Sequence, residues 1–499
     1  MTPTILTRLT PEVAVHTSGD QVTLSTDRHR LTTPASGLRG LLEALAGDGL
    51  VATTSGPPPG PDPVAGLRAG YTLRRLRALG WLEYAARGRA AAELGVLRPE
   101  STLPAGARAE AGPTVASPLE TGRADTGPTV LSRFASLAPD AEGLVLASPL
   151  TRHRFVTAHP GVLGLLAGWG RPRSPEELRA GGDLAPEEVD AVVRLLLAGG
   201  LACRVDPDGS TEEDRDPALR QWEPHDLAFH TRTRQGLATG TTGGTYRFQG
   251  EIGQLPAVKP RGTGRIVRLS LPTARSGIEL DRVLDARRSI RDHADRAIGL
   301  DQLGELLHRS ARFTDVRTVG EEELAARPFP SGGGRHELEL YVVASRCEGL
   351  APGVYHYRAA DHALEHVADP SSDSDALLAD AGFSTGTGRH PQVLVVLTAR
   401  FPRLSWKYEG IAYALVLKHV GALIQTLYLV ATSMGLAPCA VGGGESDVFA
   451  RILPESPYAE TSVGEFVVGT PDPAASGTRP GPAAAPDLDP TLFQLPQEA

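Results

Sequence analysis

The stretch from Ser405 to Gly444 reads SWKYEGIAYALVLKHVGALIQTLYLVATSMGLAPCAVGGG. It begins with a Lys–Tyr pair, continues as the most apolar long segment of the chain and ends in three glycines. Apolar residues fall on nearly every face of a helix drawn from Ile411 to Met434, which is typical of a helix buried in a large core or spanning a membrane. Lys418, His419 and Gln425 interrupt the segment, so no run reaches the ~18 uncharged residues of a membrane span. We therefore expect the central helix of a soluble protein, buried against a partner.

The composition narrows the classes of protein to consider. At 499 residues the chain is too long for one ordinary core, so two or three domains are expected. With a net charge of -9 the chain lacks the excess of basic residues that is typical of nucleic-acid-binding proteins, so we expect no nucleic-acid partner. The N-terminal segment lacks a charged region followed by an apolar one, so it is not a secretory signal. Cys203, Cys347 and Cys439 form no CxxC pair, which indicates a reducing, cytoplasmic compartment.

Lysine is rare in this chain. Of the 50 basic residues only three are lysine, Lys259, Lys407 and Lys418. Lysine can lose its proton when it is partly desolvated, whereas arginine effectively cannot. Each of the three lysines is therefore either retained by chance or occupies a position where arginine cannot replace it.

The N-terminal part is predicted to contain a small α+β unit at residues 1–100 and a flexible linker at residues 101–136. Residues 137–210 repeat the first unit, because STDRHRLTT at 25–33 resembles PLTRHRFVT at 149–157. Strand, three helices and a terminal strand in each copy predict two winged-helix-like units. Such units bind nucleic acid or peptides, and the acidity of the chain favours a peptide.

The rest of the chain divides into an arm, a domain and a tail. Residues 211–262 carry repeated turn signals and are predicted to form an extended arm. Residues 263–471 alternate helices with apolar strands, such as Leu338–Ala344 and Val393–Thr398, and indicate an α/β or α+β layered domain. Residues 472–499 are Ala/Pro-rich and are expected to be disordered.

The segment RRSIR at 287–291 could bind a phosphate. The planar guanidinium of arginine can donate two parallel hydrogen bonds to a phosphate, and a serine lies between the arginines in this segment. In an Arg-rich chain such a run is otherwise a solvated face. The candidates are Arg287, Arg288, Ser289 and Arg291.

The loop PFPSGGG at 328–334 could line a planar ligand, with Pro330, Ser331 and Gly332 as candidates. Glycines let the backbone approach a ligand closely and donate N–H bonds. No Gly-Lys-Ser/Thr follows, so the loop is not a Walker A motif. A flexible loop without a ligand is the alternative.

Two further pairs flank the central helix. Lys407 and Tyr408 could supply a base if burial or a nearby positive charge depressed a pKa; the alternative is a snorkelling lysine and a core tyrosine. Gly442 and Gly443 could make room for a ligand or simply form a turn. The histidines show no HxH or HExxH spacing, so no metal is expected.

In this order the clusters resemble those of the FMN-dependent nitroreductases, and more closely the SagB/McbC/ThcOx-type azoline dehydrogenases of ribosomal-peptide biosynthesis. The resemblance rests on HDLAFHTRTR at 225–234, RRSIR at 287–291, PFPSGGG at 328–334 with LELY at 338–341, and WKYE at 406–409. It is firm over roughly residues 220–470 and loose over residues 1–205.

The resemblance implies an α+β fold: a mainly antiparallel sheet flanked by helices, with a long central helix, in an interwoven homodimer that binds FMN at the subunit interface. The RRSIR candidates would bind the phosphate and ribityl chain. Pro330, Ser331 and Gly332 would line the isoalloxazine from the partner subunit, and Gly442 and Gly443 would approach the ring edge. Lys407 and Tyr408 match the catalytic pair of the family.

The resemblance also implies a function. The protein would oxidise thiazoline or oxazoline rings to thiazole or oxazole in a ribosomally made, modified peptide. The N-terminal units would recognise the leader of the precursor peptide, and a cyclodehydratase would be a partner. Two alternatives stay open: another flavin oxidoreductase of the same fold, acting on a small molecule or a differently modified peptide, and a non-catalytic peptide-binding scaffold.

Overall fold

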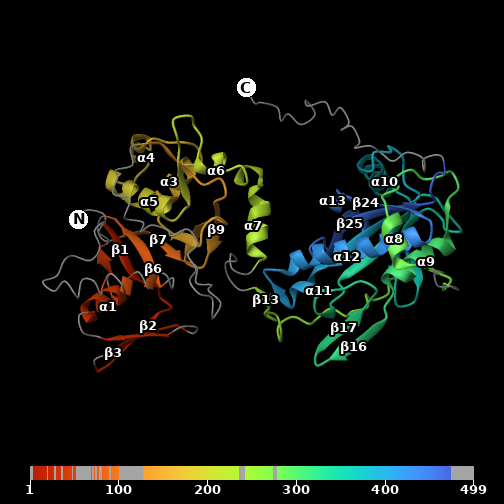
Figure 1. Cartoon of the computed structure of the whole chain (residues 1–499), viewed down its shortest axis with the longest axis horizontal. Helices are drawn as coiled ribbons and strands as arrows, with labels where there is room; N and C mark the ends of the chain where they lie inside the picture. Colours follow the sequence, from red (N-terminus) through yellow and green to blue (C-terminus); the bar gives the residue numbers. More distant parts are fainter. Residues whose placement is uncertain are drawn as a thin grey trace. The chain divides into compact units, whose positions relative to one another are not determined.

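The computed structural model describes residues 4–19, 21–26, 30–34, 38–47, 49–51, 69, 72–73, 76–77, 81–88, 92–99, 127–234, 242–272 and 278–473. The chain divides into two compact units, Met1–Thr242 and Gly243–Ala499 (Figure 1). The boundary falls inside the predicted arm. Most of the predicted linker, up to residue 126, and the predicted tail from residue 474 lie outside the described residues.

The first unit begins with strands, and its helices gather in its second half. Its elements are β1 (Thr4–Leu9), β2 (Ala14–Ser18), β3 (Gln21–Ser25), β4 (Arg30–Pro34), α1 (Arg39–Ala46), β5 (Leu50–Val51), β6 (Leu82–Arg87), β7 (Glu93–Pro99), β8 (Thr129–Leu131), β9 (Ser136–Asp140), β10 (Gly143–Ala147), β11 (His153–Thr157), α3 (Pro160–Gly168), α4 (Pro175–Ala180), α5 (Pro186–Ala198), β12 (Ala202–Arg204), α6 (Glu212–Arg215), η2 (Leu219–Gln221) and α7 (Pro224–Arg232).

One seven-stranded sheet takes strands from both predicted N-terminal units, in the order β5-β1-β6-β7-β11-β10-β9. The link is the antiparallel pair β7–β11, in which Leu97 lies opposite Phe155. Both side chains are fully buried, so apolar packing accompanies the pairing of the two strands. The element order does repeat, since β2-β3-β4-α1 is matched by β9-β10-β11-α3. The winged-helix assignment and the proposed domain limits stay predictions.

The second unit contains the longest helix of the described residues. Its elements are β13 (Gly243–Gly244), β14 (Ile266–Arg268), α8 (Leu280–Ala286), β15 (Ile298–Gly299), α9 (Leu300–Ala311), β16 (Asp315–Val319), β17 (Glu322–Ala326), η3 (Gly332–Gly334), β18 (Leu338–Ala344), β19 (Cys347–Glu348), β20 (Gly353–Arg358), β21 (Ala363–Ala368), α10 (Ser372–Ser384), β22 (Val393–Arg400), α11 (Phe401–Ser405), β23 (Tyr408–Glu409), α12 (Ala412–Ser433), β24 (Ala437–Val441), α13 (Ser446–Ile452) and β25 (Glu460–Gly469).

The central sheet of the second unit has the order β14-β21-β20-β18-β22-β25-β24. Every neighbouring pair in it is antiparallel, which confirms the predicted α+β domain with a mainly antiparallel sheet. Strands β18 and β22 are buried along their whole length. Their continuous apolar runs are explained by helices that cover both faces of the sheet.

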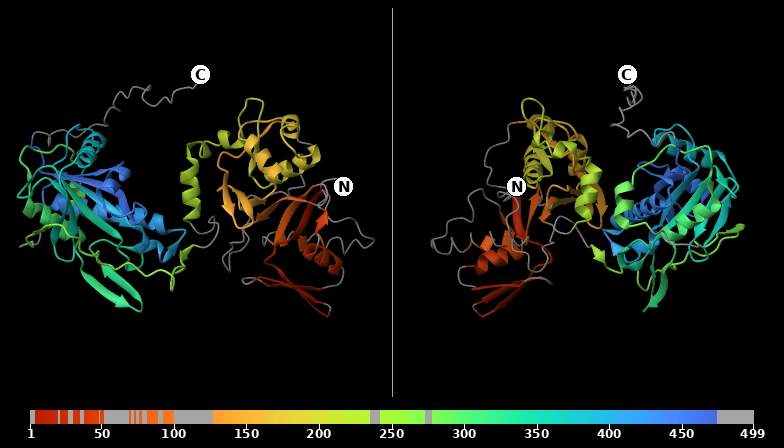
Figure 2. Two further views of the ribbon diagram at one scale, coloured as in Figure 1. Left: turned by 180° about the vertical axis from the view of Figure 1, so that it is seen from behind. Right: turned by 45° about the vertical axis from the view of Figure 1, so that its right-hand side comes forward.

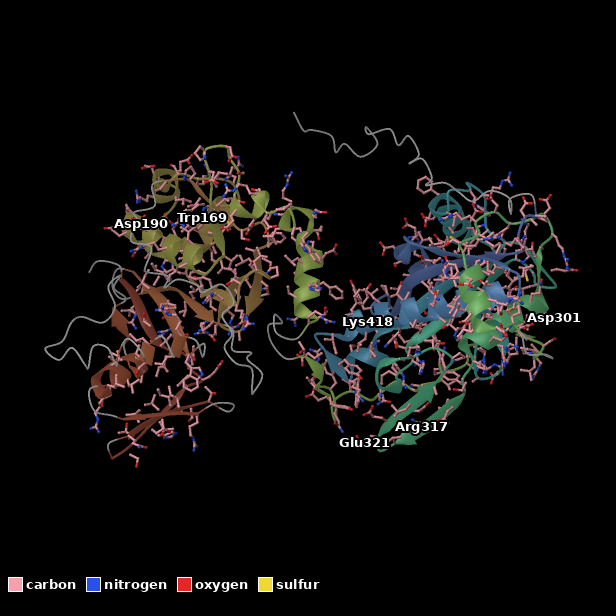
Figure 3. All side chains as sticks on the ribbon, viewed as in Figure 1. Trp169, Asp190, Asp301, Arg317, Glu321 and Lys418 are labelled. Atoms are coloured by element: carbon pink, nitrogen blue, oxygen red, sulfur yellow. The ribbon has the colours of Figure 1, made fainter. Side chains whose placement is uncertain are left out.

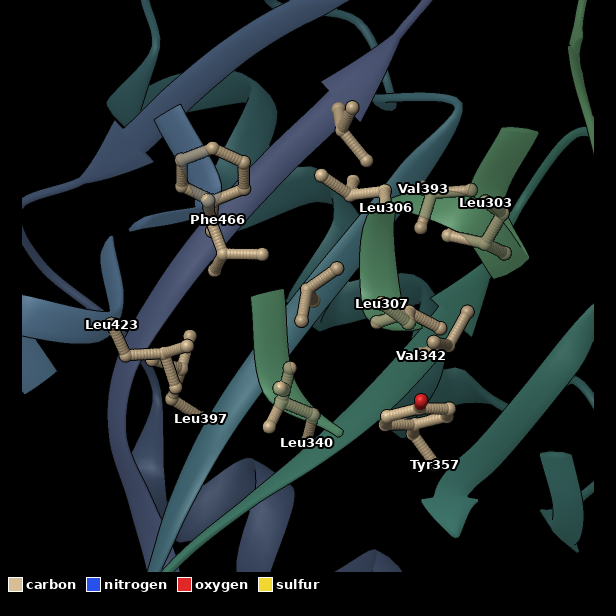
Figure 4. Close-up of a cluster of buried hydrophobic side chains, with 14 of the residues drawn as sticks. Leu303, Leu306, Leu307, Leu340, Val342, Tyr357, Val393, Leu397, Leu423 and Phe466 are labelled. Atoms are coloured by element: carbon tan, nitrogen blue, oxygen red, sulfur yellow. The ribbon is translucent and has the colours of Figure 1, made fainter. Parts of the chain in front are cut away.

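Side chains along each strand alternate between the two faces of the sheet, so the second unit has two hydrophobic cores. Leu340 and Val342 of β18 face the helices α9 and α12, while Tyr341 and Val343 face α10 and α13. Figure 4 shows the first core, where side chains from the sheet and from both helices are directed toward one another. The second unit is thus a helix–sheet–helix sandwich.

Helix α12 is buried along one face. Val416, Leu423 and Leu427 pack into the core, whereas Tyr413 and Leu417 are 48% and 41% exposed. By length and composition alone α12 could cross a membrane; it is the single such helix among the described residues. Core helices of soluble proteins pass the same test, and α12 packs on the sheet, so this is weak evidence for a membrane.

A β-hairpin, β16–β17, extends from the body of the second unit (Figure 2). Strand β16 is exposed along its whole length. The arm fastens β17 near the hairpin turn: the Glu323 N–H donates to Oε1 of Gln254 at 3.0 Å, and the Ala257 N–H donates to Oε1 of Glu323 at 2.9 Å. The arm and the hairpin are therefore held together.

Candidate active site

The Lys–Tyr pair and the glycine loop lie in one place. Lys407 follows α11, and Tyr408 opens β23, which pairs with β13 of the arm. At Gly333 the backbone φ is +61°, and an ideal Cβ there would lie 2.6 Å from the Tyr408 hydroxyl and 3.5 Å from Nζ of Lys407. Only glycine allows this approach. The structure therefore brings both catalytic candidates against the predicted ligand loop.

The ammonium group of Lys407 is paired with a carboxylate. Its Nζ lies 3.1 Å from Oε2 of Glu322, at the start of β17, and the buried Arg335 donates to the same oxygen at 2.8 Å. Burial lowers the pKa of Lys407, but hydrogen bonds with Tyr246 and Glu322 outweigh it, and the pKa is raised. A depressed pKa, the condition under which Lys407 could be a base, is not found in this protomer, because the carboxylate stabilises the charged form.

The central helix holds the glycine loop through His419. The N–H of Gly332 donates to Nε2 of His419 at 2.7 Å, and Nδ1 lies 2.7 Å from Oε1 of the buried Glu337. The Ser331 hydroxyl accepts a hydrogen bond from the His336 N–H at 2.9 Å. These contacts fix the backbone of the predicted ligand loop. We call Ser331, Gly332, Gly333, Lys407 and Tyr408 the loop half-site.

The arginine cluster lies at the other end of α12. The Ser289 hydroxyl is 2.7 Å from the hydroxyl of Tyr428, which also accepts the Ala440 N–H at 2.8 Å. The guanidinium of Arg287 lies over the Tyr428 ring at 5.3 Å. Arg288 is exposed and, within the described residues, has no ion pair.

The cluster can therefore receive an anion. Within the part of the chain that the structure describes, neither Arg287 nor Arg291 forms an ion pair either. Arg287 lies beside the Tyr428 and Ser289 hydroxyls, Arg288 and Arg291 are close to it in sequence, and none of the three has a paired carboxylate among the described residues, which suits a phosphate. We call Arg287, Arg288, Ser289, Arg291 and Tyr428 the arginine half-site.

The glycine turn follows β24 and not the end of α12. At Gly442 an added Cβ would meet open space, and at Gly443 it would make only ordinary contact. At Gly444 it would overlap the carboxylate of Glu465. Burial raises the pKa of Glu465, which is 4% exposed. The turn thus needs glycine at Gly444, while Gly442 and Gly443 leave space for another molecule.

The two half-sites are separated along one helix. His419 contacts the loop half-site and Tyr428 belongs to the arginine half-site, nine residues further on. At 1.5 Å per residue this is about 14 Å along the axis. One protomer thus brings Lys407 and Tyr408 to Ser331 and Gly332, but does not bring them to the arginine cluster.

Several residues of the site were missed by sequence reasoning. Tyr246, Glu322 and Arg335 surround Lys407, and no local pattern marks them. His419 did carry a signal, because it interrupts an otherwise apolar helix. Tyr428 lies in an apolar stretch and is buried in the core, but its hydroxyl reaches Ser289.

Two family matches cover different parts of the chain. Residues 284–470 match the Nitroreductase family, and residues 129–239 match the family of the cyanobactin oxidase ThcOx. The first range contains both half-sites. The second lies within the first unit and contains β8 through α7.

Individual relatives match shorter parts. The chain is 27% identical over 195 residues to the nitroreductase-like protein MJ1384 of Methanocaldococcus jannaschii, covering 39% of this chain and 93% of that protein. It is 28% identical over 175 residues to the trifolitoxin-processing protein TfxB of Rhizobium leguminosarum bv. trifolii, covering 34% of this chain and 47% of TfxB. The chain thus spans about half the length of TfxB.

Among solved structures, the chain is similar to one in the Escherichia coli microcin synthetase McbBCD complex with truncated pro-MccB17 bound. The identity is 20%, the coverage 51% of this chain and 96% of that chain, and the TM-score 0.32. At this TM-score the likeness carries no argument about function. The nitroreductase match covers the residues that build the site and the ThcOx match covers part of the first unit, which supports a nitroreductase-fold protein of the SagB/McbC/ThcOx type.

Proposed function

We propose that this protein is an FMN-dependent dehydrogenase that oxidises thiazoline or oxazoline rings to thiazole or oxazole in a ribosomally made, modified peptide. The observation that carries the proposal is the contact of Lys407 and Tyr408 with the glycine loop at Gly333. That contact puts two proton-transfer groups beside a backbone suited to a planar ring.

The two half-sites fit the two ends of FMN. The guanidiniums of the arginine half-site and the Ser289 and Tyr428 hydroxyls suit its phosphate. The Gly332–Gly333 backbone and the open space at Gly442 suit a flat ring. Members of the nitroreductase family typically use a flavin, which supplies the two-electron chemistry when bound.

A homodimer would complete the site. Because the half-sites lie at opposite ends of α12, the loop half-site of one protomer would face the arginine half-site of the other. Exposed apolar side chains are available for the contact: Tyr413 and Leu417 on α12, and Leu280 and Leu284 on α8. A two-fold axis would use each of these surfaces twice.

The reaction removes two hydrogens from adjacent ring carbons. One leaves as a proton from the former Cα, which is acidified by the neighbouring imine and carbonyl, and the other leaves as a hydride with both electrons. Of Lys407 and Tyr408, one would take up the proton and the other would stabilise the developing negative charge. The glycine loop and the hairpin strand that carries Glu322 would keep water from the ring.

A peptide substrate is supported by the first unit. Residues 129–239 match the cyanobactin oxidase family, and TfxB is named as a trifolitoxin-processing protein. We propose that this unit binds the leader of the precursor peptide and that a cyclodehydratase supplies the azoline. A cytoplasmic location accords with this role.

A second candidate is a flavin reductase for small molecules. It is favoured by the match to 93% of MJ1384 over only 195 residues of this chain, because a relative of that length has no counterpart for most of the chain. The two candidates differ in their electron donor. A small-molecule reductase would consume NAD(P)H rapidly without peptide, whereas an azoline dehydrogenase would be reduced by its peptide.

The experiment begins with purified protein and a flavin spectrum. Lys407→Arg and Tyr408→Phe are then assayed on an azoline peptide, with Lys418→Arg on the exposed face of α12 as the matched control. The proposal expects losses of about 10²–10⁴-fold for the first two and none for the control. Full activity in both site variants would rule out the assigned role.

A further inference from the structure

We propose that Glu322 and Tyr246 are positioning residues that hold Lys407 as an ammonium ion in the loop half-site. Lys407 would then stabilise the negative charge of the reaction, and Tyr408 would be the proton acceptor. The catalytic roles of Lys407 and Tyr408 rest on the proposed function. The contacts that hold Lys407 do not depend on it.

Glu322 binds Lys407 from the hairpin. Its Oε2 and Oε1 lie 3.1 Å and 3.4 Å from Nζ, and the two side chains are only 16% and 19% exposed for Lys407 and Glu322. Arg335, fully buried, anchors the same carboxylate at 2.8 Å. Glu322 therefore cannot turn away from the site without leaving Arg335 unpaired, which fixes it beside Lys407.

Tyr246 binds Lys407 from the arm. Its N–H donates to the Lys407 carbonyl at 3.2 Å, and its ring centroid lies 4.8 Å from Nζ. Its side chain also raises the pKa of Lys407 and lowers that of Glu322. The backbone φ of Tyr246 is +54°, which a bulky residue adopts at a cost. Packing of the surrounding residues stabilises this strained backbone conformation, which places the phenol ring against Lys407.

The groups that face Nζ come from four elements of the chain. They are Glu322 from β17, Tyr246 from the arm, Tyr408 from β23 and Arg335 before β18. The carboxylate and the two aromatic faces favour a cation, and the guanidinium of Arg335 opposes it. The raised pKa of Lys407, in which burial is outweighed by Tyr246 and Glu322, agrees with the cation.

This arrangement assigns the two catalytic candidates. An ammonium ion has no lone pair to accept a proton, so Lys407 can act only as a charge stabiliser. The proton from the ring Cα would pass to the Tyr408 oxygen, which must enter the step as phenolate beside the ammonium ion. The O–H bond of Tyr408 then forms as the Cα–H bond breaks.

The rarity of lysine makes a direct test possible. Trace acetylation of the full-length protein across pH, followed by peptide mass spectrometry, gives the titration midpoint of each of the three lysines. The exposed Lys418 on α12 is the internal reference (Figure 3). We expect the Lys407 midpoint to lie above that of Lys418 and to move down in Glu322→Gln.

The controls use neighbouring residues. Glu321→Gln changes the adjacent, exposed carboxylate at the hairpin turn (Figure 3), which contacts Gln249 and not Lys407, and should leave the midpoint unchanged. Glu322→Gln also deprives Arg335 of its carboxylate, so Tyr246→Phe is the second variant, and it should lower the midpoint while keeping that ion pair. A Lys407 midpoint below that of Lys418, or one unmoved in both variants, would overturn the proposal.

This titration needs neither flavin nor peptide, so its outcome is independent of the proposed function. If the azoline activity is present, it should decline at high pH as Lys407 loses its proton. This decline should shift to lower pH in Tyr246→Phe. If the midpoints behave as expected but no peptide is oxidised, the positioning holds and the proposed function fails.

Discussion

The N–H of Gly332 donates a 2.7 Å hydrogen bond to Nε2 of His419, so the ring must carry its proton on Nδ1, which faces the carboxylate of Glu337. This chain of contacts ties the glycine loop to α12. The helix thereby holds the loop half-site with His419 and the arginine half-site with Tyr428.

Removing the imidazole should loosen the loop. His419→Leu leaves the buried Glu337 and the Gly332 N–H without their partner, and we expect the free energy of unfolding to fall by about 1–3 kcal/mol. Urea unfolding measures the loss. Lys418→Leu, at the exposed neighbouring position, should change it by less than about 0.5 kcal/mol. Equal stability of His419→Leu and the wild type would show that the hydrogen bonds contribute nothing.

The arginine half-site should distinguish ligands by their phosphate. Losing one charge-assisted contact of about 1.5–3 kcal/mol predicts that Arg288→Ala weakens FMN binding roughly 10–100-fold. Riboflavin, which lacks the phosphate, should bind wild type and variant equally. Arg282→Ala, an exposed arginine on α8, is the matched control. Fluorescence titration measures both ligands, and an equal loss for both would contradict a phosphate contact.

The glycine turn offers a matched pair of substitutions. Gly444→Ala would place a Cβ in the carboxylate of Glu465 and should cost about 1–3 kcal/mol of stability. Gly442→Ala meets open space, so the fold should be unaffected while flavin affinity falls. Thermal unfolding and flavin titration separate the two effects. Normal flavin affinity in Gly442→Ala would place the ring elsewhere.

Acid should destabilise the second unit through His336. Burial, followed by the charges of Arg327 and Arg403, lowers the pKa of His336 to about 3. The unfolded chain takes up the proton near pH 6.5 and the folded chain does not, so stability is fully present above pH 6.5. It then falls by about 1.4 kcal/mol per pH unit toward pH 3.

His336→Asn should remove that share of the acid sensitivity. Asparagine tolerates the φ of +45° at this position, so the backbone is retained. The acid-unfolding midpoint should therefore move to lower pH. His293, whose pKa burial lowers to about 4, keeps its own contribution in the variant. An unchanged midpoint would mean that His336 is not held neutral in the folded protein.

A site shared between protomers predicts complementation. At an FMN concentration that saturates only the wild type, Arg288→Ala and Lys407→Ala each disable every site of their own homodimer. In a mixed dimer one of the two sites combines the intact half-site of each chain, so random mixing should restore about a quarter of the wild-type activity. Activity that stays absent after subunit exchange, confirmed by mass, would place both half-sites in one protomer.

The elements with continuous or periodic apolar patterns could be predicted from the sequence. The run LELYVVA gave β18, and the apolar segment after Tyr408 gave α12, since both patterns report burial directly. RRSIR and PFPSGGG could be singled out by their composition, but a solvated face and a flexible loop stayed as alternatives until the structure placed them. Helix α4 begins with a capping box at Ser174, a start signal that can be read in the sequence SPEE at 174–177.

Pairings across long stretches of sequence could not be predicted. Glu322 meets Lys407 only because the hairpin, the arm and β23 converge, and each of these segments is locally unremarkable. The joining of β7 to β11 spans the predicted linker for the same reason. Which glycine of the turn is indispensable depends on Glu465, a residue of another strand.

The central claim is that the flavin takes its electrons from an azoline ring. The direct measurement is a single anaerobic turnover: flavin-loaded protein is mixed with an azoline peptide, and flavin absorbance and peptide mass are followed together. The proposed activity predicts bleaching of the flavin with a loss of about 2 Da per ring, one hydride and one proton for each flavin reduced. A flavin that bleaches with NAD(P)H while the peptide mass stays unchanged would contradict it.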